Sequence, residues 1–407
     1  MSGSYSDIRS RMWSRVANRP GGTLQLLAGV RQLGKTTLLQ SLAQENKPAI
    51  YAAGDNPSST LPGSWDRVWS EAHQRAAGGS AILLLDEIQR WPDWWLRLSW
   101  RMDQVVRDRI PLHVIATLSA KSLLVSSVEQ PKIDRYSEEL QHWKTSDICS
   151  LFGVIAQLAV SEIVRRGTYP AIVPLWSDEA KWSTHVREAI INPALGLDAA
   201  EMADIRKPNL LRQVFALAAS SPCEVLSIQK IQRAIDDRGA METVAAYLSI
   251  LKSIGLVAPI EIFSDRPRLR NAPPKLVVLN NALASAVAPG GAPDAINEPD
   301  RWSRWVENAC LAFVISQGQQ VRYWRDETLE VDAVIDGTWG QWAVEVRTTP
   351  FTDLDLRGLA IFVKRYPDYR PLVITTAGNL DVARRAGFAA VKWGSFLMKG
   401  LDAVDGR

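Results

Sequence analysis

Short, wholly apolar runs alternate with longer amphipathic stretches in the first third of the chain. Runs of this kind are typical of parallel strands that a sheet buries on both faces. Four of them lie at residues 24–28, 49–52, 81–85 and 112–116, with helical periodicity between them. The pattern predicts an α/β domain with a parallel sheet, which we place at residues 1–165.

The rest of the sequence divides into two further regions. Residues 166–287 are mainly helical and close with two strand-like runs, 256–263 and 275–279, on either side of a turn rich in Pro and Arg. Helices followed by a β-hairpin predict a winged helix in this middle domain. Pro and Gly then accumulate at 288–293, which marks a linker.

Residues 288–407 combine one helical stretch with several strand-like runs. The helix is expected at 302–317, and the strands at 321–324, 330–335, 341–346 and 371–375. This order predicts a second, mixed α/β domain at the C-terminal end.

Composition narrows the class of protein only slightly. Lys and Arg number 47 against 44 Asp and Glu, and the net charge of +3 excludes a basic tail protein or an acidic disordered chain. Any contact with nucleic acid must therefore come from a local patch. The three cysteines form no Cys-x-x-Cys pair and the four histidines show no metal-ligand spacing, so we expect neither disulfides nor structural zinc. The sequence starts without a secretory signal and has no apolar run long enough to cross a bilayer, so we expect a cytoplasmic protein without membrane contacts.

A phosphate-binding pattern follows the first apolar run. Residues 29–36 read Gly-Val-Arg-Gln-Leu-Gly-Lys-Thr and fit GxxxxGK[ST], with a strand before them and a helix after them. The backbone N–H groups of such a loop surround phosphates, the Lys neutralises the β- and γ-phosphates, and the hydroxyl binds Mg²⁺. We therefore predict ATP and Mg²⁺ as cofactors, with Lys35 as a catalytic residue and Thr36 as a metal ligand. The predicted nucleotide contacts of this segment are Gly29, Arg31, Gln32, Leu33, Gly34, Lys35, Thr36 and Thr37.

Two carboxylates follow the third apolar run. Asp86 ends that run and is predicted to hold Mg²⁺, partly through water, while Glu87 is placed to orient and deprotonate the attacking water. The fourth run leads to Thr117 and Ser119, and either hydroxyl could sense the γ-phosphate from a strand between the other two. The alternative for these two residues is an ordinary cap of the helix that follows.

Together these motifs resemble a prokaryotic family of AAA-superfamily ATPases. The resemblance rests on residues 29–39 and 85–94, then on 166–170, the strand containing Lys275, and the stretch from 324–325 to 345–347. It implies a P-loop ATPase followed by a winged helix and an uncharacterised domain similar to restriction-type nucleases. The chain departs from the family where Leu118 and Ser119 replace Gly-Ser, and no Gly-Arg follows. Arg135 is a candidate for the arginine that contacts the γ-phosphate, and a surface arginine in a loop is the simpler interpretation.

The C-terminal domain carries a possible metal site. Asp332 and Glu345 lie on neighbouring predicted strands, and Arg347 follows two residues later on the same strand face. This resembles the D…ExK pattern of restriction-type nucleases, whose two carboxylates hold a divalent metal, and Glu307 could complete the acidic set. Arg347 replaces the usual Lys and cannot act as a base. We favour the competing interpretation, an inherited fold whose carboxylates pair with nearby arginines (Arg322, Arg325 and Arg347).

The turn of the predicted wing is basic. Arg266, Arg268 and Arg270 alternate along it, with Lys275 beyond. Extended backbone would place the three arginines on one side, where they could bind the phosphates of DNA or an acidic protein. A solvated hairpin tip is the alternative.

The motifs therefore predict a Mg²⁺-dependent ATPase of the AAA superfamily. In this hypothesis the nucleotide state changes how the winged helix and the nuclease-like domain sit relative to the ATPase domain. Two alternatives stay open: an ATP-regulated, metal-dependent DNA nuclease, and a non-hydrolysing, nucleotide-gated adaptor. A protein partner or a second copy of the chain is expected if the site needs an arginine from outside.

Tryptophan is unusually frequent, with 16 copies against 8 Tyr and 8 Phe. Trp91, Trp94 and Trp95 follow the carboxylates at 86 and 87 with the spacing of one helix face, and Trp100 comes next. Core packing of that helix is one explanation. The other is an aromatic platform beside the γ-phosphate that would couple the nucleotide state to a partner.

Overall fold

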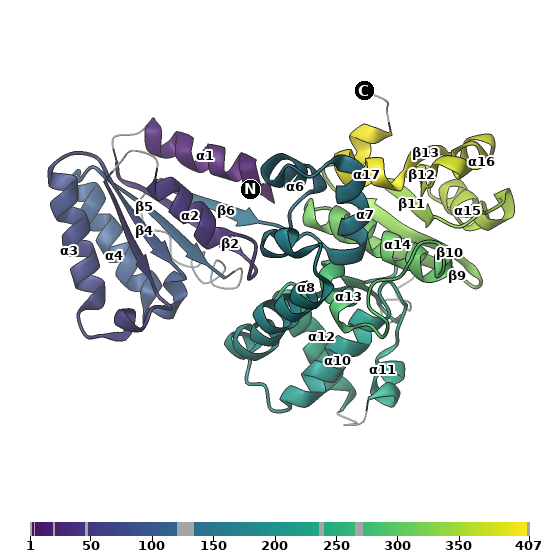
Figure 1. Ribbon diagram of the computed structural model, residues 1–407, viewed down its shortest axis with the longest axis horizontal. Coiled ribbons are helices and arrows are strands. Elements are labelled where there is room, and N and C mark those ends of the chain that lie inside the picture. Colours follow the sequence, from purple (N-terminus) through teal and green to yellow (C-terminus); the bar gives the residue numbers. More distant parts are fainter. Residues whose placement is uncertain are drawn as a thin grey trace. The chain divides into compact units, whose positions relative to one another are not determined.

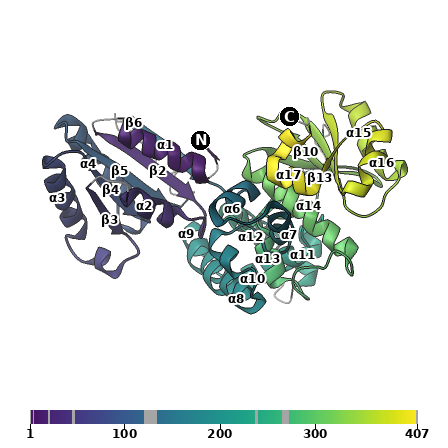
Figure 2. The same cartoon turned by 45° about the horizontal axis from the view of Figure 1, so that its top comes forward.

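The computed structural model describes residues 2–3, 5–18, 21–44, 48–119, 134–235, 240–264 and 272–404. The chain divides into two compact units, Met1–Gln141 and His142–Arg407, whose elements are labelled in Figures 1 and 2. The predicted α/β class, with a parallel sheet, a helical middle region and a C-terminal mixed sheet, is confirmed. None of the helices within the described ranges is long and apolar enough to cross a membrane.

In the described part of the first unit, six strands form one parallel sheet in the order β1-β6-β2-β5-β4-β3. All four apolar runs predicted as strands are strands, and the one ending at Thr117 lies between the other two motif-bearing strands as expected. Strands β1 and β6 were not predicted. The bounds are β1 Ser2–Gly3, β2 Thr23–Gly29, β3 Ala49–Ala53, β4 Ala81–Asp86, β5 Leu112–Leu118 and β6 Asp134–Leu140.

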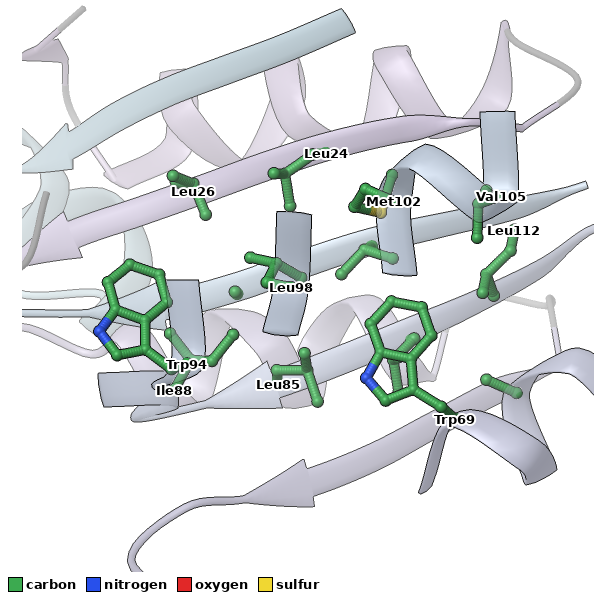
Figure 3. Packing of buried hydrophobic residues seen from close by; sticks show 14 of the residues in the cluster. Leu24, Leu26, Trp69, Leu85, Ile88, Trp94, Leu98, Met102, Val105 and Leu112 are labelled. Atoms are coloured by element: carbon green, nitrogen blue, oxygen red, sulfur yellow. The ribbon is translucent and has the colours of Figure 1, made fainter. Parts of the chain in front are cut away.

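One face of this sheet carries the main apolar core of the first unit. Helices α3 (Ser64–Ala77) and α4 (Trp94–Arg107) cover it. Their large side chains lie over alternate residues of β2, β4 and β5, and full burial of each contributes about 1.5–3 kcal/mol. Figure 3 shows this layer, with Trp69, Trp94, Leu98 and Met102 packed over Leu24, Leu26 and Leu85.

The opposite face is covered by α1 (Tyr5–Ala17) and α2 (Lys35–Ala43), and its contacts are more polar. Gln25 of β2 donates from Nε2 to the carbonyl of Met12 at 3.1 Å. Glu138 of β6, buried beneath α1, accepts from Arg11 Nη2 at 2.7 Å and pairs with Arg15 Nη2 at 2.8 Å. These ion pairs attach α1 to a strand that has little apolar character.

The second unit begins with a mainly helical region that ends in a short antiparallel hairpin, β7 with β8. Stretches Val186–Ile191 and Ala194–Asp198 within it are π-helical. The helices are α6 Thr145–Phe152, α7 Ala156–Arg166, α8 Glu179–His185, α9 Ala199–Met202, α10 Pro208–Ser220, α11 Ile228–Ala234, α12 Met241–Ser253 and α13 Asn281–Val287, and the strands are β7 Val257–Ile260 and β8 Lys275–Val278.

The C-terminal part of this unit is a sheet in the order β13-β12-β11-β10-β9. Strands β9, β10 and β11 pair antiparallel, whereas β11, β12 and β13 pair parallel. Helix α15 packs with α16 over one apolar face of the sheet. The bounds are α14 Pro299–Ser316, β9 Gln320–Asp326, β10 Leu329–Asp336, β11 Trp342–Arg347, α15 Arg357–Arg365, β12 Arg370–Thr375, α16 Leu380–Arg385, β13 Ala389–Lys392 and α17 Trp393–Lys399.

The segment 166–170, on which part of the family resemblance rests, has a structural role in this unit. Gly167 has φ 77° where α7 ends, and a Cβ there would collide with the side chain of Asn280. Thr168 exchanges two hydrogen bonds with Asn280, from its N–H to Oδ1 at 3.1 Å and from Asn280 Nδ2 to its hydroxyl at 2.9 Å. Asn281 adds a bond from Nδ2 to Val164 O at 2.7 Å. These contacts fasten the end of α7 to the start of α13.

Candidate functional site

The phosphate-binding pattern forms a tight loop between β2 and α2. A Cβ on Gly29, whose φ is 156°, would lie 2.7 Å from the carbonyl oxygen of Leu140, so glycine is needed where β6 pairs beside it. Gln32 and Gly34 adopt left-handed φ values of 64° and 91° and turn the chain into α2. The N–H groups of the first helical turn and the positive end of the helix dipole at the start of α2 favour an anion beside the loop.

The remaining predicted contacts of this segment lie around the same turn. Leu33 is buried and anchors the loop, whereas Arg31 is half-buried. Thr36 and Thr37, in the first turn of α2, are exposed. Their hydroxyls are therefore open to a ligand from solvent.

Lys35 folds back over the loop, and its side chain is only 7% exposed. Its Nζ donates to the carbonyl oxygens of Gly29 at 2.9 Å and Val30 at 3.1 Å, and lies 3.7 Å from Glu87 Oε1. Carbonyl groups are neutral acceptors, and charge-assisted hydrogen bonds to phosphate oxygens are stronger. The ammonium can therefore exchange these contacts for a polyphosphate.

Asp86 is buried at the end of β4, and both of its carboxylate oxygens have partners. Tyr51 of β3 donates its phenol to Oδ2 at 2.8 Å, and the hydroxyl of Thr117 donates to Oδ1. Burial raises the pKa of the Tyr51 phenol, and its hydrogen bond to Asp86 raises that pKa further. The phenol therefore stays protonated and continues to donate. Tyr51, in the middle of β3, was missed at the sequence level.

Glu87 stands in a left-handed turn directly after β4, with φ 49° and ψ 48°. A non-glycine residue in this region of φ/ψ space is uncommon and is often found at functional sites. The backbone N–H of Glu87 donates to the Thr117 hydroxyl at 2.9 Å, and Gln89 Nε2 donates to Glu87 Oε2 at 2.6 Å. These two bonds fix the carboxylate so that Oε1 faces Lys35.

Thr117 thus contacts both carboxylate residues, through the side chain of Asp86 and the backbone of Glu87. Ser119 follows the end of β5 and is half-buried. Arg135 does not lie in a loop as expected: it is on β6, with its guanidinium carbon 5.0 Å from the ring centroid of Trp95. The prediction failed because β6 is mostly polar, so its sequence does not show the apolar pattern of a buried strand.

The residues at this edge fit a magnesium ion. Thr36 and Asp86 supply only oxygen atoms, which are the ligands Mg²⁺ prefers, and Mg²⁺ commonly keeps several of its waters. Asp86 Oδ2 accepts a hydrogen bond from Tyr51, and Oδ1 accepts one from Thr117. A carboxylate oxygen can accept two, so room remains for a metal-bound water.

The tryptophans after Glu87 are mainly core residues. Trp94 and Trp95 are buried in the layer under α4, so the core-packing interpretation is confirmed for them. Trp91 is buried too, with its ring 5.8 Å from that of Trp65, but it precedes the helix, which begins at Trp94. Trp100 differs, because 60% of it is exposed.

In the second unit, two of the three carboxylates predicted as a nuclease-like site, Glu307 and Asp332, lie beside Lys275 together with Glu330. Its Nζ lies 2.5 Å from Glu307 Oε1, 3.0 Å from Asp332 Oδ1 and 3.5 Å from Glu330 Oε1. We call these four residues the Lys275 cluster. Lys275 follows the arginines of the predicted wing as the first residue of β8, but its side chain is only 2% exposed and turns inward to α14 and β10. The sequence contained no signal for this pairing, since its members are remote along the chain.

Glu345 and Arg347 lie beside that cluster on β11. Arg347 donates from Nε to Glu345 Oε1 at 2.9 Å, and its Nη2 lies 2.6 Å from the same oxygen. Asp332 Oδ2 accepts from the N–H of Val346 at 2.9 Å. The other two arginines of that interpretation pair with carboxylates outside the predicted set, Arg325 with Glu330 at 2.5 Å and Arg322 with Asp336 at 2.6 Å.

Burial shifts the proton affinities of these carboxylates. Desolvation and the neighbouring Asp332 raise the pKa of Glu307 to about 8. The same two causes raise the pKa of Glu345 well above its usual range. The pKa of Asp332 is lowered instead, because Lys275 and the Val346 N–H outweigh its desolvation. Despite burial, the surrounding carboxylates hold the pKa of Lys275 well above its usual range.

The arginines predicted for the wing, Arg266, Arg268 and Arg270, lie outside the described residues. The two strands that flank them, β7 and β8, pair antiparallel as predicted.

Comparisons with protein families identify the first unit. Residues 22–144 match the AAA domain family. This part of the chain is therefore similar to an AAA domain. Residues 157–294 match a domain of unknown function (DUF8612), which covers most of the helical region and the hairpin.

Comparisons with individual proteins give more distant similarities. A search of the curated proteins finds no match. Among solved structures, a RuvB variant from Thermotoga maritima is 16% identical with a TM-score of 0.35, covering 68% of this chain and 92% of its own. The Orc1 protein of Aeropyrum pernix in complex with DNA is 14% identical with a TM-score of 0.28, covering 70% and 92%. AMPPCP-bound DnaA from Aquifex aeolicus is 11% identical with a TM-score of 0.31, covering 61% and 87%.

Proposed function

We propose that this chain is a Mg²⁺-dependent ATPase whose nucleotide site lies at the carboxyl ends of β2, β4 and β5. One observation carries the proposal: Lys35, Asp86 and Glu87 meet beside the start of α2, with Lys35 Nζ 3.7 Å from Glu87 Oε1. The match of residues 22–144 to the AAA domain supports the same function.

In this proposal the phosphates of ATP bind the loop and the first turn of α2. Lys35 releases the carbonyls of Gly29 and Val30 and binds the β- and γ-phosphate oxygens. Thr36 would hold Mg²⁺ directly and Asp86 would hold it through water, and the bound ion would neutralise phosphate charge.

Glu87 is the general base of the proposal. Gln89 occupies its Oε2, which leaves Oε1 on the side of Lys35 to accept a proton from the attacking water. Thr117 is a positioning residue, since its hydroxyl bonds both to Asp86 and to the backbone of Glu87.

We also propose that the nucleotide state changes the position of the second unit. The second unit would in turn bind DNA, a protein partner or another copy of the chain. The basic turn at 266–270 is the proposed DNA contact. A nucleotide-gated adaptor that binds ATP without hydrolysing it remains the second candidate, because Lys35 and its loop would serve both functions.

Calorimetric titration with ATP and Mg²⁺ tests the site, and turnover with duplex DNA, single-stranded DNA or RNA tests the coupling. We expect Lys35→Ala to lose ATP binding, because no other described cation of the loop occupies its position. Arg107→Ala is the matched control, since Arg107 is an exposed cation on α4 that pairs with Asp108. ATP binding that survives Lys35→Ala would overturn the site, whereas binding without turnover in the unmodified protein would favour the adaptor.

A further inference from the structure

We infer that the ammonium of Lys275 fills the cation position of the acidic cluster, so that this part of the second unit takes an internal lysine where a divalent metal was expected. The inference is independent of the proposed ATPase, because none of its residues belongs to the first unit.

The distances leave no place for a second cation. Nζ of Lys275 lies between Glu307 Oε1, Asp332 Oδ1 and Glu330 Oε1, at 2.5, 3.0 and 3.5 Å. An ammonium has three N–H donors, and here it forms ion pairs with three carboxylates, of which Asp332 also accepts a hydrogen bond at 3.0 Å. A Mg²⁺ ion bound at about 2.1 Å to the same oxygens would lie beside the ammonium and be repelled by it.

The lysine is also held in place. It belongs to β8, which pairs with β7, and a further bridge joins Lys275 to Val225. Its side chain is 2% exposed, so it has no solvent into which it could swing. Its Nζ additionally approaches the carbonyl oxygen of Asp332 at 3.4 Å.

The second carboxylate of the expected metal pair is engaged as well. Glu345 Oε1 binds Arg347, and Asp332 Oδ2 binds the Val346 N–H. Among the described residues, no group of three His, Cys, Asp or Glu side chains is arranged to hold a metal ion. The residues present therefore do not fit the divalent metal of a restriction-type site.

Charge balance supports the same conclusion. Burial raises the pKa of Glu307 to about 8 and that of Glu345 well above its usual range, which favours their neutral forms. Metal ligands must be deprotonated, so both groups would have to lose a proton before they could bind a metal. Lys275 and Arg347 already balance the carboxylates that remain charged.

The cluster instead joins parts of the second unit that are far apart in sequence. Lys275 comes from the hairpin within the region 157–294, while its partners come from α14 and β10. The lysine thus acts as an ionic tie between that region and the C-terminal sheet.

The test is a titration of the nucleotide-free, full-length protein with Mn²⁺ at about pH 8, where Glu307 begins to ionise, with free Mn²⁺ followed by electron paramagnetic resonance. We expect the unmodified protein and Asp332→Asn to bind the same amount of Mn²⁺. We expect Lys275→Ala to gain a site that disappears again in Lys275→Ala/Asp332→Asn, because removal of the ammonium leaves the acidic pocket without its cation. Lys230→Ala is the matched control, since it removes an exposed lysine paired with Glu224.

Two results would overturn the inference. One is Mn²⁺ binding in the unmodified protein that Asp332→Asn abolishes, and this comparison holds even if Lys275→Ala does not fold. The other is a folded Lys275→Ala protein, checked by circular dichroism, that gains no Mn²⁺ site and is not stabilised by Mn²⁺ on heating.

Discussion

Lys35 and Lys275 are both almost fully buried, but their surroundings give them different chemistry. Lys35 donates to two neutral carbonyls, and its Nζ lies 3.7 Å from the carboxylate oxygen Oε1 of Glu87. Lys275 has carboxylate oxygens of Glu307 and Asp332 within 3.0 Å. The first lysine retains charge for an incoming anion, whereas the second is already neutralised by its own chain.

Thr117 offers a test of positioning at the nucleotide site. Thr117→Ala removes the bonds to Asp86 and to the Glu87 backbone, and we expect turnover to fall about 10- to 100-fold, as for other outer-shell partners. ATP affinity should change little, because the residue does not line the loop of Lys35. Thr117→Ser keeps the hydroxyl and should retain most of the turnover. Equal losses in both variants would show that the methyl group, and not the hydrogen bonds, is what matters.

At the scale of elements, the sequence predicted those strands whose buried residues are apolar. Strands β2, β3, β4 and β5 were predicted because their residues are almost entirely apolar, as a sheet covered on both faces requires. Strand β6 was missed because it reads Asp-Arg-Tyr-Ser-Glu-Glu-Leu, and its buried Glu138 is stabilised by arginines of α1 that no local pattern could identify.

The proposed nucleotide site and the Lys275 cluster also differ in how far the sequence predicts them. The residues of the proposed nucleotide site follow strand ends in a known order, so the positions of Lys35, Asp86 and Glu87 could be predicted. Tyr51 and Gln89 could not, because a hydrogen-bond partner leaves no pattern of its own. The position of Lys275 depends on how β8 packs against α14 and β10, which is a tertiary property.

The attachment of α1 to β6 is testable through Glu138. Burial alone would raise the pKa of Glu138, but hydrogen bonds from Arg11 and Arg15 lower it, so the carboxylate is bound in its charged form. We expect Glu138→Gln to destabilise the first unit by about 3 kcal/mol, measured by denaturant unfolding, because it leaves two arginines without their buried partner. The loss should shrink as the pH falls, since the native carboxylate then becomes protonated. Glu139→Gln, on the half-buried neighbour, is the control.

At the scale of the whole molecule, the two units should respond differently to pH. Glu138 in the first unit has a lowered pKa, so its contribution is lost as the pH falls. Glu307 in the second unit has a raised pKa of about 8. The folded chain therefore keeps a proton on Glu307 that the unfolded chain releases near pH 4.5. The contribution of this proton to the free energy of unfolding is lost as the pH rises.

The interval between pH 6.5 and about 8 avoids the titration of His142, because burial lowers its pKa from 6.5 to about 4 and the imidazole is neutral in both the folded and the unfolded chain above pH 6.5. We expect the free energy of unfolding of the second unit to fall across this interval. Glu307→Gln keeps a neutral side chain beside Lys275 and should flatten the fall, measured by urea unfolding at successive pH values. An unchanged slope in Glu307→Gln would assign the proton to another group.

The central claim, hydrolysis of ATP with Glu87 as the base, is tested most directly by steady-state release of phosphate from Mg²⁺-ATP. The variant is Glu87→Gln, and the control is Glu71→Gln on the exposed face of α3, where Glu71 pairs with Arg75. We predict turnover by the unmodified protein and by Glu71→Gln, and a loss on the order of 10²-fold or more in Glu87→Gln with ATP binding retained. Turnover by Glu87→Gln at the rate of the unmodified protein would contradict this mechanism.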